Sequence, residues 1–328
     1  MTPRLAGTRF RDRTIALGNG VKGQNVELPS ASPLNYHQAI SAPAEMARTL
    51  VDGKLFLPPA AAPRNGWALV IIVPGSLGVD ETHLAHAEAL TGAGLAAFVL
   101  DSFGARGITS TVTNQTQYSF AASAWDVLAA WRVLSALPDI DATRIGAQGH
   151  SRGGSAVLTA ATRRFADAAL GPDLGLTAVL AAYPWSGHQF LDPRVGATQI
   201  RVLMGDRDDW CSVQQVQGHL QAIRLTGGAV SLRLFGGAAH SFDRDIPIVR
   251  IEDARVAPGG PTAYLDGDGA YVHPLTGRAD AALTDRDVAV YNLKAGYGVR
   301  GATLGSSGKQ AIEFRDDMLA FWDMTLRA

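Results

Sequence analysis

Apolar runs and helical patterns alternate along most of this chain. Trp67 to Val73 is a continuous apolar run, which is typical of a strand that is buried on both faces. The segment from Glu81 to Thr91 has a helical pattern, and Ala96 to Leu100 is the next apolar run. We expect further strands at 144–148, 177–182, 200–204 and 230–235, and further helices at 118–136, 155–161, 212–225 and 310–326. This alternation predicts an α/β fold with a mostly parallel, doubly wound sheet that is covered by helices on both faces.

The two ends of this pattern differ from its middle. Residues 1–45 are polar and glycine-rich, with no sustained period before about Leu34, and we expect an N-terminal arm or lead-in. The segments 46–51 and 54–57 flank Asp52-Gly53, a dipeptide that favours a two-residue hairpin turn. We expect residues 46–328 to form a single domain.

The interval from about residue 244 to residue 308 interrupts the alternation. It is rich in Gly, Pro, Asp and Ala and has only short apolar runs, although Ile246, Tyr264, Tyr271 and Tyr291 give it apolar groups that need cover. An irregular segment of this length inside a domain is usually functional or disordered. We expect an ordered excursion, inserted before the last helix, that packs on the domain and partly borders the entrance to the site.

The most informative motif is Gly149-His150-Ser151-Arg152-Gly153, which lies between an expected strand and an expected helix. A G-x-S-x-G sequence in this position is typical of a nucleophile elbow, a strained turn that exposes the serine Oγ above the sheet. The pattern alone is weak evidence in a chain with 36 glycines. The strand and helix around it favour Ser151 as a nucleophile over an ordinary glycine-rich turn.

A serine nucleophile needs a base and a group that orients the base, and both follow Ser151 along the chain. Asp208 lies just beyond the expected strand 200–204, and His240 lies just beyond the expected strand 230–235. The order Ser, Asp, His is that of the α/β-hydrolases. Each residue also follows the carboxyl end of a strand, where open α/β sheets form their sites. We expect Asp208 to be the acid, with Asp206 and Asp209 as alternatives.

The same chemistry needs backbone N–H donors for the oxyanion of the tetrahedral intermediate. One donor is expected from Arg152, directly after the nucleophile. The other is expected from the loop after strand 67–73, where Pro74 has no N–H, so that Ser76 is preferred and Leu77 is the second choice. We expect Tyr183, Trp185 and Trp210 to contribute to the substrate pocket, with simple packing as the alternative for the first two.

Composition restricts the remaining function classes. The net charge of −1 disfavours a nucleic-acid partner, and no apolar run is long enough to cross a membrane. Cys211 is the single cysteine, and its acidic neighbours make it a poor nucleophile. His83 and His86 are three residues apart on an expected helix but lack a carboxylate partner at helical spacing on their far side, so we expect no metal site. No cofactor is expected. The oligomeric state is left open.

The chain resembles α/β-hydrolases of the dienelactone hydrolase-like group. The motifs that carry this resemblance are the expected strand that leads to Gly75, the run Asp101 to Gly107, the G-x-S-x-G motif, Gly205 to Trp210 and Ala238 to Phe242. The resemblance implies nucleophile, acid and base roles for Ser151, Asp208 and His240. The dienelactone enzymes carry cysteine at the elbow, so a dienelactone substrate does not follow. Many members also have His-Gly where this chain has Pro74-Gly75.

Together these features predict a serine hydrolase that cleaves small to medium carboxylic esters through an acyl-enzyme. A peptidase or amidase with the same triad, and a non-catalytic binding protein that retains the fold, are the alternatives. The sequence starts without the apolar core of a signal peptide. We therefore expect a cytoplasmic protein, or a secreted one whose leader is absent from this sequence.

Overall fold

The central element of the computed structural model is an eight-stranded sheet in the order β1-β2-β4-β3-β5-β6-β8-β9. The structure describes residues 9–327. Six neighbouring strands, from β4 to β9 in that order, run parallel, and β2 is antiparallel to both of its neighbours. The strands are β1 (Gln24–Ser32), β2 (Ala47–Phe56), β3 (Trp67–Val73), β4 (Ala96–Asp101), β5 (Ile140–His150), β6 (Ala178–Ala182), β8 (Gln199–Gly205) and β9 (Val230–Phe235).

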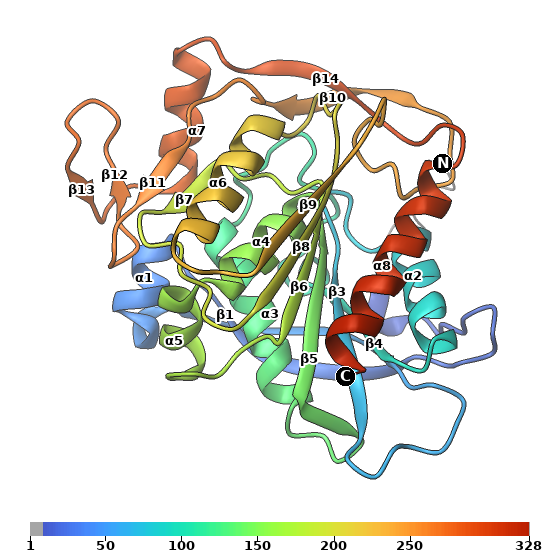
Figure 1. Ribbon diagram of the computed structural model, residues 1–328. Coiled ribbons are helices and arrows are strands. Elements are labelled where there is room, and N and C mark those ends of the chain that lie inside the picture. The colour runs from blue at the N-terminus through green and yellow to red at the C-terminus, as the bar shows by residue number, and fades with distance from the viewer. Residues whose placement is uncertain (1–8, 328) are drawn as a thin grey trace.

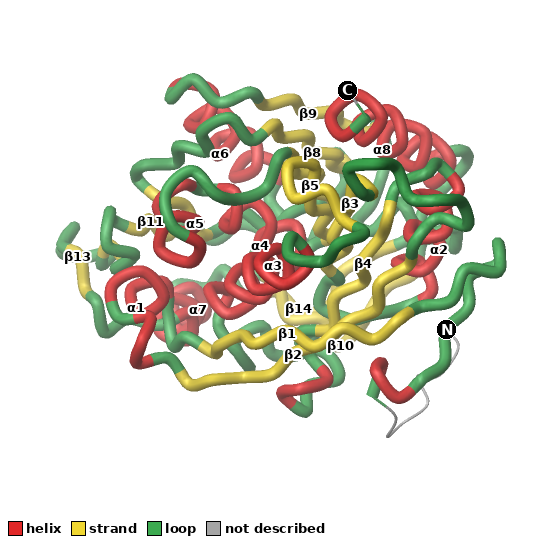
Figure 2. The backbone as a smooth tube through the Cα atoms, turned by 90° about the horizontal axis from the view of Figure 1, so that it is seen from below, coloured by secondary structure: helices red, strands yellow, loops and turns green. Residues whose placement is uncertain are grey.

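Helices cover both faces of this sheet, as the alternating pattern predicts. Helices α2 (Glu81–Gly92) and α8 (Gln310–Leu326) lie on one face, and α3 (Phe120–Leu134), α4 (Arg152–Ala161) and α6 (Val213–Leu225) lie on the other (Figures 1 and 2). All residues of β3, β4 and β6 are buried, because these strands have helices on both sides. The predicted mostly parallel α/β fold is confirmed. Among the described residues, no helix combines the length and apolarity that a membrane crossing requires.

The structure corrects the expected arm and hairpin. Residues 24–32 are not a lead-in, because they form β1 and pair antiparallel with β2 along their whole length. Asp52-Gly53 is not a turn but lies inside β2, opposite Asp101 and Leu100 of β4. A Cβ on Gly53 would lie 2.3 Å from the ring of Phe98, so glycine is needed here for close strand packing and not for a turn.

The segment 244–308 is largely ordered into small elements over the carboxyl ends of the sheet strands (Figure 1). β10 (Val249–Val256) and β14 (Val299–Leu304) pair antiparallel. β11 (Ala263–Leu265), β12 (Tyr271–Val272) and β13 (Ala279–Asp280) form a second small sheet with β7 (His188–Phe190). The remaining helices are α1 (Tyr36–Ser41), α5 (Arg163–Leu170), α7 (Asp285–Lys294) and the 3-10 turns η1 (Phe10–Asp12), η2 (Pro43–Glu45) and η3 (Gly104–Arg106).

Candidate active site

Ser151 lies at a sharp turn between β5 and α4. Its backbone adopts φ 55° and ψ −115°, a conformation that is strained for a residue with a Cβ. The neighbouring glycines are required by close approach, since a Cβ on Gly149 would lie 2.0 Å from the carbonyl oxygen of Gly153. A Cβ on Gly153 would in turn lie 2.1 Å from the carbonyl oxygen of Val73. The turn therefore holds Ser151 in a strained conformation between β5 and α4, as a nucleophile elbow requires.

Asp208 and His240 reach Ser151 from the loops that follow β8 and β9, with β6 between these strands and β5 in the sheet. The Nε2 atom of His240 lies 2.9 Å from the Oγ of Ser151, and its Nδ1 lies 2.7 Å from the Oδ2 of Asp208. The side chains of His240 and Asp208 are 3% and 0% exposed. The other carboxylate oxygen of Asp208 accepts hydrogen bonds from the backbone N–H groups of Trp210 and Cys211, both at 2.9 Å. These bonds fix the carboxylate against the imidazole.

The alternative acids and the cysteine have other partners. Asp206 accepts a hydrogen bond from the backbone N–H of Gly237, and Asp209 accepts one from the backbone N–H of Thr303 on β14. Burial raises the pKa of the Cys211 thiol well above its ordinary value, and the charge of Asp208 raises it further. A thiol in this state is protonated at neutral pH and is a poor nucleophile.

Two of the three expected pocket residues contact the imidazole of His240. The ring of Trp210 stacks on it at 5.2 Å, and the ring of Tyr183 meets it edge-on at 4.7 Å. Both line the cavity at Ser151, whereas Trp185 is not among its lining residues. Trp185 packs on Phe120 and the imidazole of His188, with both ring separations at 4.6 Å. Its position after β6 directs it toward α3, so the simple packing alternative describes it.

The loop after β3 passes directly beside the elbow, because Val73 pairs with Gly149 in the sheet. A Cβ on Gly75 would lie 2.9 Å from the carbonyl oxygen of His150, so the loop approaches this closely only with glycine there. Ser76 and Leu77 line the same cavity as Ser151. Arg152 is the first residue of α4. The backbone N–H groups in the first turn of a helix have no partner within the helix, so that of Arg152 can bind an anion.

The cavity beside Ser151 is small, with about 20 Å³ of free volume, roughly the room of one water molecule. Val112 and Leu304 complete its apolar wall. Leu304 is the last residue of β14, and it forms an isolated bridge with His240. The expected contact between the excursion and the site entrance is therefore made by β14.

A buried polar network lies behind the site and was missed in the sequence. Asp243, with a fully buried side chain, contacts the Nε2 of His86 at 2.9 Å and the Nδ1 of His150 at 3.1 Å. The hydroxyl of Tyr183 donates a hydrogen bond to it at 2.7 Å. Burial pushes the pKa of Asp243 up, but the hydrogen bonds from His150 and His86 outweigh this and hold it well below its usual value. Burial also lowers the pKa of His150 to about 4.

This network ties together the segments that carry the candidate catalytic groups. His150 directly precedes Ser151, Asp243 follows His240 by three residues, and Tyr183 lies against His240. Among the described residues, two groups have ligand atoms within 4.8 Å of one another and could hold a metal ion. One is His86, His150 and Asp243 in this network, and the other is Asp208, Cys211 and His240 at the candidate site. His83 also has a carboxylate partner, Asp80, at 2.8 Å. The spacing of residues along α2 could not predict Asp243 as the partner of His86, because Asp243 lies in a loop that is distant in the sequence.

Comparison with known proteins identifies the family and supports the fold. The model of the dienelactone hydrolase family matches residues 51–257, and the chain belongs to this family. Membership supports a hydrolytic enzyme. No curated protein matches the chain. A dienelactone hydrolase-like promiscuous phosphotriesterase from metagenomic libraries has a similar fold, with a TM-score of 0.52, 15% identity and coverage of 92% of this chain and 99% of that one. A protein named m3DLH has a TM-score of 0.50 and 19% identity, with coverage of 68% and 85%.

Proposed function

We propose that the protein is a serine esterase that cleaves carboxylic esters with small acyl groups through an acyl-enzyme. The observation that carries this proposal is the hydrogen-bonded series from Ser151 through His240 to Asp208, with separations of 2.9 and 2.7 Å. Each separation is short enough for a proton to move or to be held. The strained backbone of Ser151 supports the same role, because strain of this kind persists where the surrounding structure enforces it.

In the proposed reaction, the Oγ of Ser151 attacks the ester carbonyl while the Nε2 of His240 accepts its proton. Asp208 holds the Nδ1 proton and stabilises the imidazolium that forms. The N–H groups of Arg152 and of Ser76 are the proposed donors to the oxyanion, with Leu77 as the second choice in the loop. His240 then gives its proton to the leaving alcohol, and water releases the acyl group by the same steps.

The size of the cavity favours small acyl groups. Val112 and Leu304 border the little free volume beside Ser151, so a long acyl chain has to displace them. A phosphotriesterase has a similar fold, but at 15% identity this similarity does not indicate the substrate of this chain. An ester is also an easier substrate than an amide, because its leaving group needs less protonation. We therefore place esters before peptides.

A panel of p-nitrophenyl esters of increasing acyl length, measured beside peptide anilides, tests this function. We expect acetate and butyrate esters to give the highest kcat/KM and the anilides to give little turnover. Ser151→Ala and His240→Ala should each lower kcat by on the order of 10⁴ to 10⁶, and the double variant should fall hardly further because the two groups act as a unit. Additive losses, or faster turnover of the anilides, would contradict the proposal.

A further inference from the structure

The segment from Ser110 to Tyr118 connects the two halves of the proposed oxyanion hole, and we call it the crossing segment. On one side it holds the loop after β3. The backbone N–H of Thr111 donates to the carbonyl oxygen of Ser76 at 2.8 Å, and the hydroxyl of Ser110 donates to the same oxygen at 3.1 Å. Ser76 is thus held at its carbonyl while its own N–H is the proposed donor.

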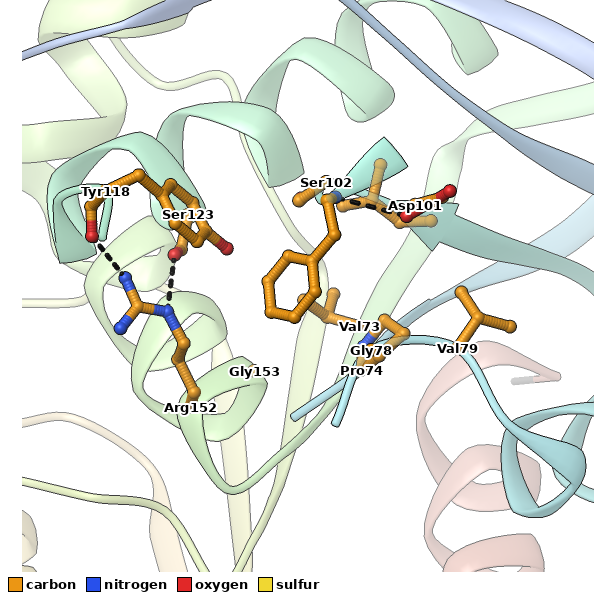
Figure 3. A pocket seen from close by; sticks show the side chains of 12 residues that line it. Val73, Pro74, Gly78, Val79, Asp101, Ser102, Tyr118, Ser123, Arg152 and Gly153 are labelled. Atoms are coloured by element: carbon orange, nitrogen blue, oxygen red, sulfur yellow. Dashed lines mark hydrogen bonds between the residues drawn. The ribbon is translucent and has the colours of Figure 1, made fainter. Parts of the chain in front are cut away.

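On its other side the crossing segment holds the side chain of Arg152, the residue after the nucleophile. The guanidinium donates to the carbonyl oxygen of Tyr118 at 2.8 Å and to the hydroxyl of Ser123 at 3.2 Å (Figure 3). It also lies over the rings of Tyr118 and Phe120, at 4.5 and 3.9 Å. Arg152 is 2% exposed, and no carboxylate of residues 9–327 forms a salt bridge with it. A buried guanidinium needs all of these acceptors, so it fixes the carbonyls that it binds.

Gln115 is the one residue of the crossing segment that hydrogen-bonds to both halves. Its side-chain Oε1 accepts a hydrogen bond from the hydroxyl of Ser76 at 3.0 Å. Its backbone carbonyl accepts a hydrogen bond from the guanidinium of Arg152 at 2.7 Å. Thr111 supports the same Oε1 from its hydroxyl at 3.3 Å. Ser76 and Arg152 lie on different elements, β3's loop and α4, and Gln115 is a direct link between them.

We propose that Gln115 is a positioning residue of the oxyanion hole, which sets the N–H of Ser76 relative to the N–H of Arg152. This inference rests on the proposed function. Oxyanion donors act only when they are aimed at the place where the charge develops, and a shift of about 1 Å in a positioned group costs on the order of 100-fold in rate. Loss of the Gln115 acceptor frees the Ser76 side chain and with it one side of the loop. It leaves Ser151, His240 and Asp208 untouched.

Gln115→Met tests the proposal, because methionine keeps the length of the side chain and removes its acceptor. We expect kcat for p-nitrophenyl acetate to fall about 10- to 100-fold while KM changes less than about threefold. A trifluoromethyl ketone, which forms a tetrahedral adduct with an oxyanion, should lose affinity by the same factor as kcat/KM. The pH at which the base titrates in the kcat/KM profile should stay unchanged, because the contacts of His240 are retained.

Gln117→Met is the matched control. Gln117 is an exposed glutamine in the same segment, and its side chain donates to the carbonyl oxygens of Ser110 and Asn114 and not to Ser76 or Arg152. We expect its kcat and ketone affinity to stay within about twofold of the wild type. Ser76→Ala removes the hydroxyl partner and keeps the backbone N–H. Combined with Gln115→Met it should cost no more than either change alone, because both break one hydrogen bond.

The proposed function and this inference fail in different ways. If the wild-type protein does not turn over esters, the function is wrong. If the wild type is active and Gln115→Met keeps its kcat and its ketone affinity, or if Gln117→Met loses as much, Gln115 is not a positioning residue. Additive losses in the Ser76→Ala combination would also overturn the link. A rise in KM alone would assign Gln115 to the binding of substrate.

Discussion

At the scale of single residues, the site contains two histidine–aspartate pairs with different surroundings. His240 lines the cavity beside Ser151, and Asp208 lies against its Nδ1. His150 lines the same cavity with Asp243 against its Nδ1, and His150 is neutral near pH 7 because burial lowers its pKa to about 4. The first pair can accept and hold a proton in the proposed reaction. In the second pair, the other imidazole nitrogen of His150 contacts the side-chain amide of Gln148 at 3.1 Å and not a serine hydroxyl.

Asp208→Asn should retain the fold and lower kcat by on the order of 10⁴, because asparagine leaves the imidazole in the wrong tautomer. The asparagine oxygen can still accept from the backbone N–H groups of Trp210 and Cys211. Asp206→Asn and Asp209→Asn are the matched controls and should retain most of the activity. Ester hydrolysis and circular dichroism of the three variants check this. A large loss in Asp209→Asn with little loss in Asp208→Asn would assign the acid to Asp209.

Asp243→Ala should lower the free energy of unfolding by at least about 3 kcal/mol. It leaves His86, His150 and Tyr183 without their shared acceptor in a buried place, and each unsatisfied buried group costs about 1–3 kcal/mol. Asp245→Ala, two residues later and exposed, should change it by less than about 0.5 kcal/mol. Urea denaturation measures both. Equal stability of the two variants would show that the network contributes little.

At the scale of elements, the excursion acts on the site through β14. The indole N–H of Trp210 donates to the carbonyl oxygen of Thr303 at 2.7 Å, and the backbone N–H of Thr303 donates to the carboxylate of Asp209. Leu304 then reaches the cavity. The apolar side chains of the excursion were expected to pack on the domain. Tyr271 does so and is buried, whereas Ile246 and Tyr264 are 39% and 45% exposed.

Leu304→Ala should widen acyl acceptance. It removes a side chain from the wall of a cavity with little free volume, so the ratio of kcat/KM for hexanoate to that for acetate should rise about 10-fold. Leu304 is buried, and its loss costs about 2–5 kcal/mol of stability. Val112→Ala, on the opposite segment of the wall, is a milder second variant that should act in the same direction. An unchanged ratio in both folded variants would show that this wall does not limit acyl size.

Much of the fold could be predicted because its strands and helices repeat strong local patterns. The buried run 67–73, the helix 81–91 and the last helix, 310–326, lie within a residue or two of where the pattern puts them. β1 could not be found, because an edge strand that pairs with only one neighbour needs no apolar alternation. Asp52-Gly53 gave a wrong prediction of a turn, because turn propensity depends only on neighbouring residues. The glycine is needed for close packing against β4, which is distant in the sequence. The turn at Ser151 could be predicted because the residues that need close contact, Gly149 and Gly153, belong to the motif itself.

At the scale of the whole molecule, buried histidines make the fold sensitive to acid. Burial lowers the pKa of His219 from 6.5 to about 4. The unfolded chain therefore binds a proton there below about pH 6.5, whereas the folded protein does so only near pH 4. The contribution of His219 to stability is complete above about pH 6.5 and is lost as the pH falls toward 4, by about 3 kcal/mol. His150 acts in the same direction.

His219→Gln should flatten this pH dependence. Between pH 7 and pH 4.5 the variant should lose about 2–3 kcal/mol less of its unfolding free energy than the wild type, because glutamine does not titrate. Urea denaturation at several pH values measures the slope, and the stability at pH 7 is the reference for each protein. Parallel curves for the two proteins would mean that His219 is not held neutral in the fold.

The most direct test of the whole account is the reaction of Ser151 with a fluorophosphonate probe. In the proposed mechanism Ser151 is nucleophilic only in the folded site, where His240 lies 2.9 Å from its Oγ and accepts its proton. We predict one probe per chain, attached to Ser151 in peptide mapping, with no labelling after unfolding and strongly slowed labelling in His240→Ala. Absence of labelling in the folded wild type, or attachment to another residue, would contradict the assignment of Ser151 as the nucleophile.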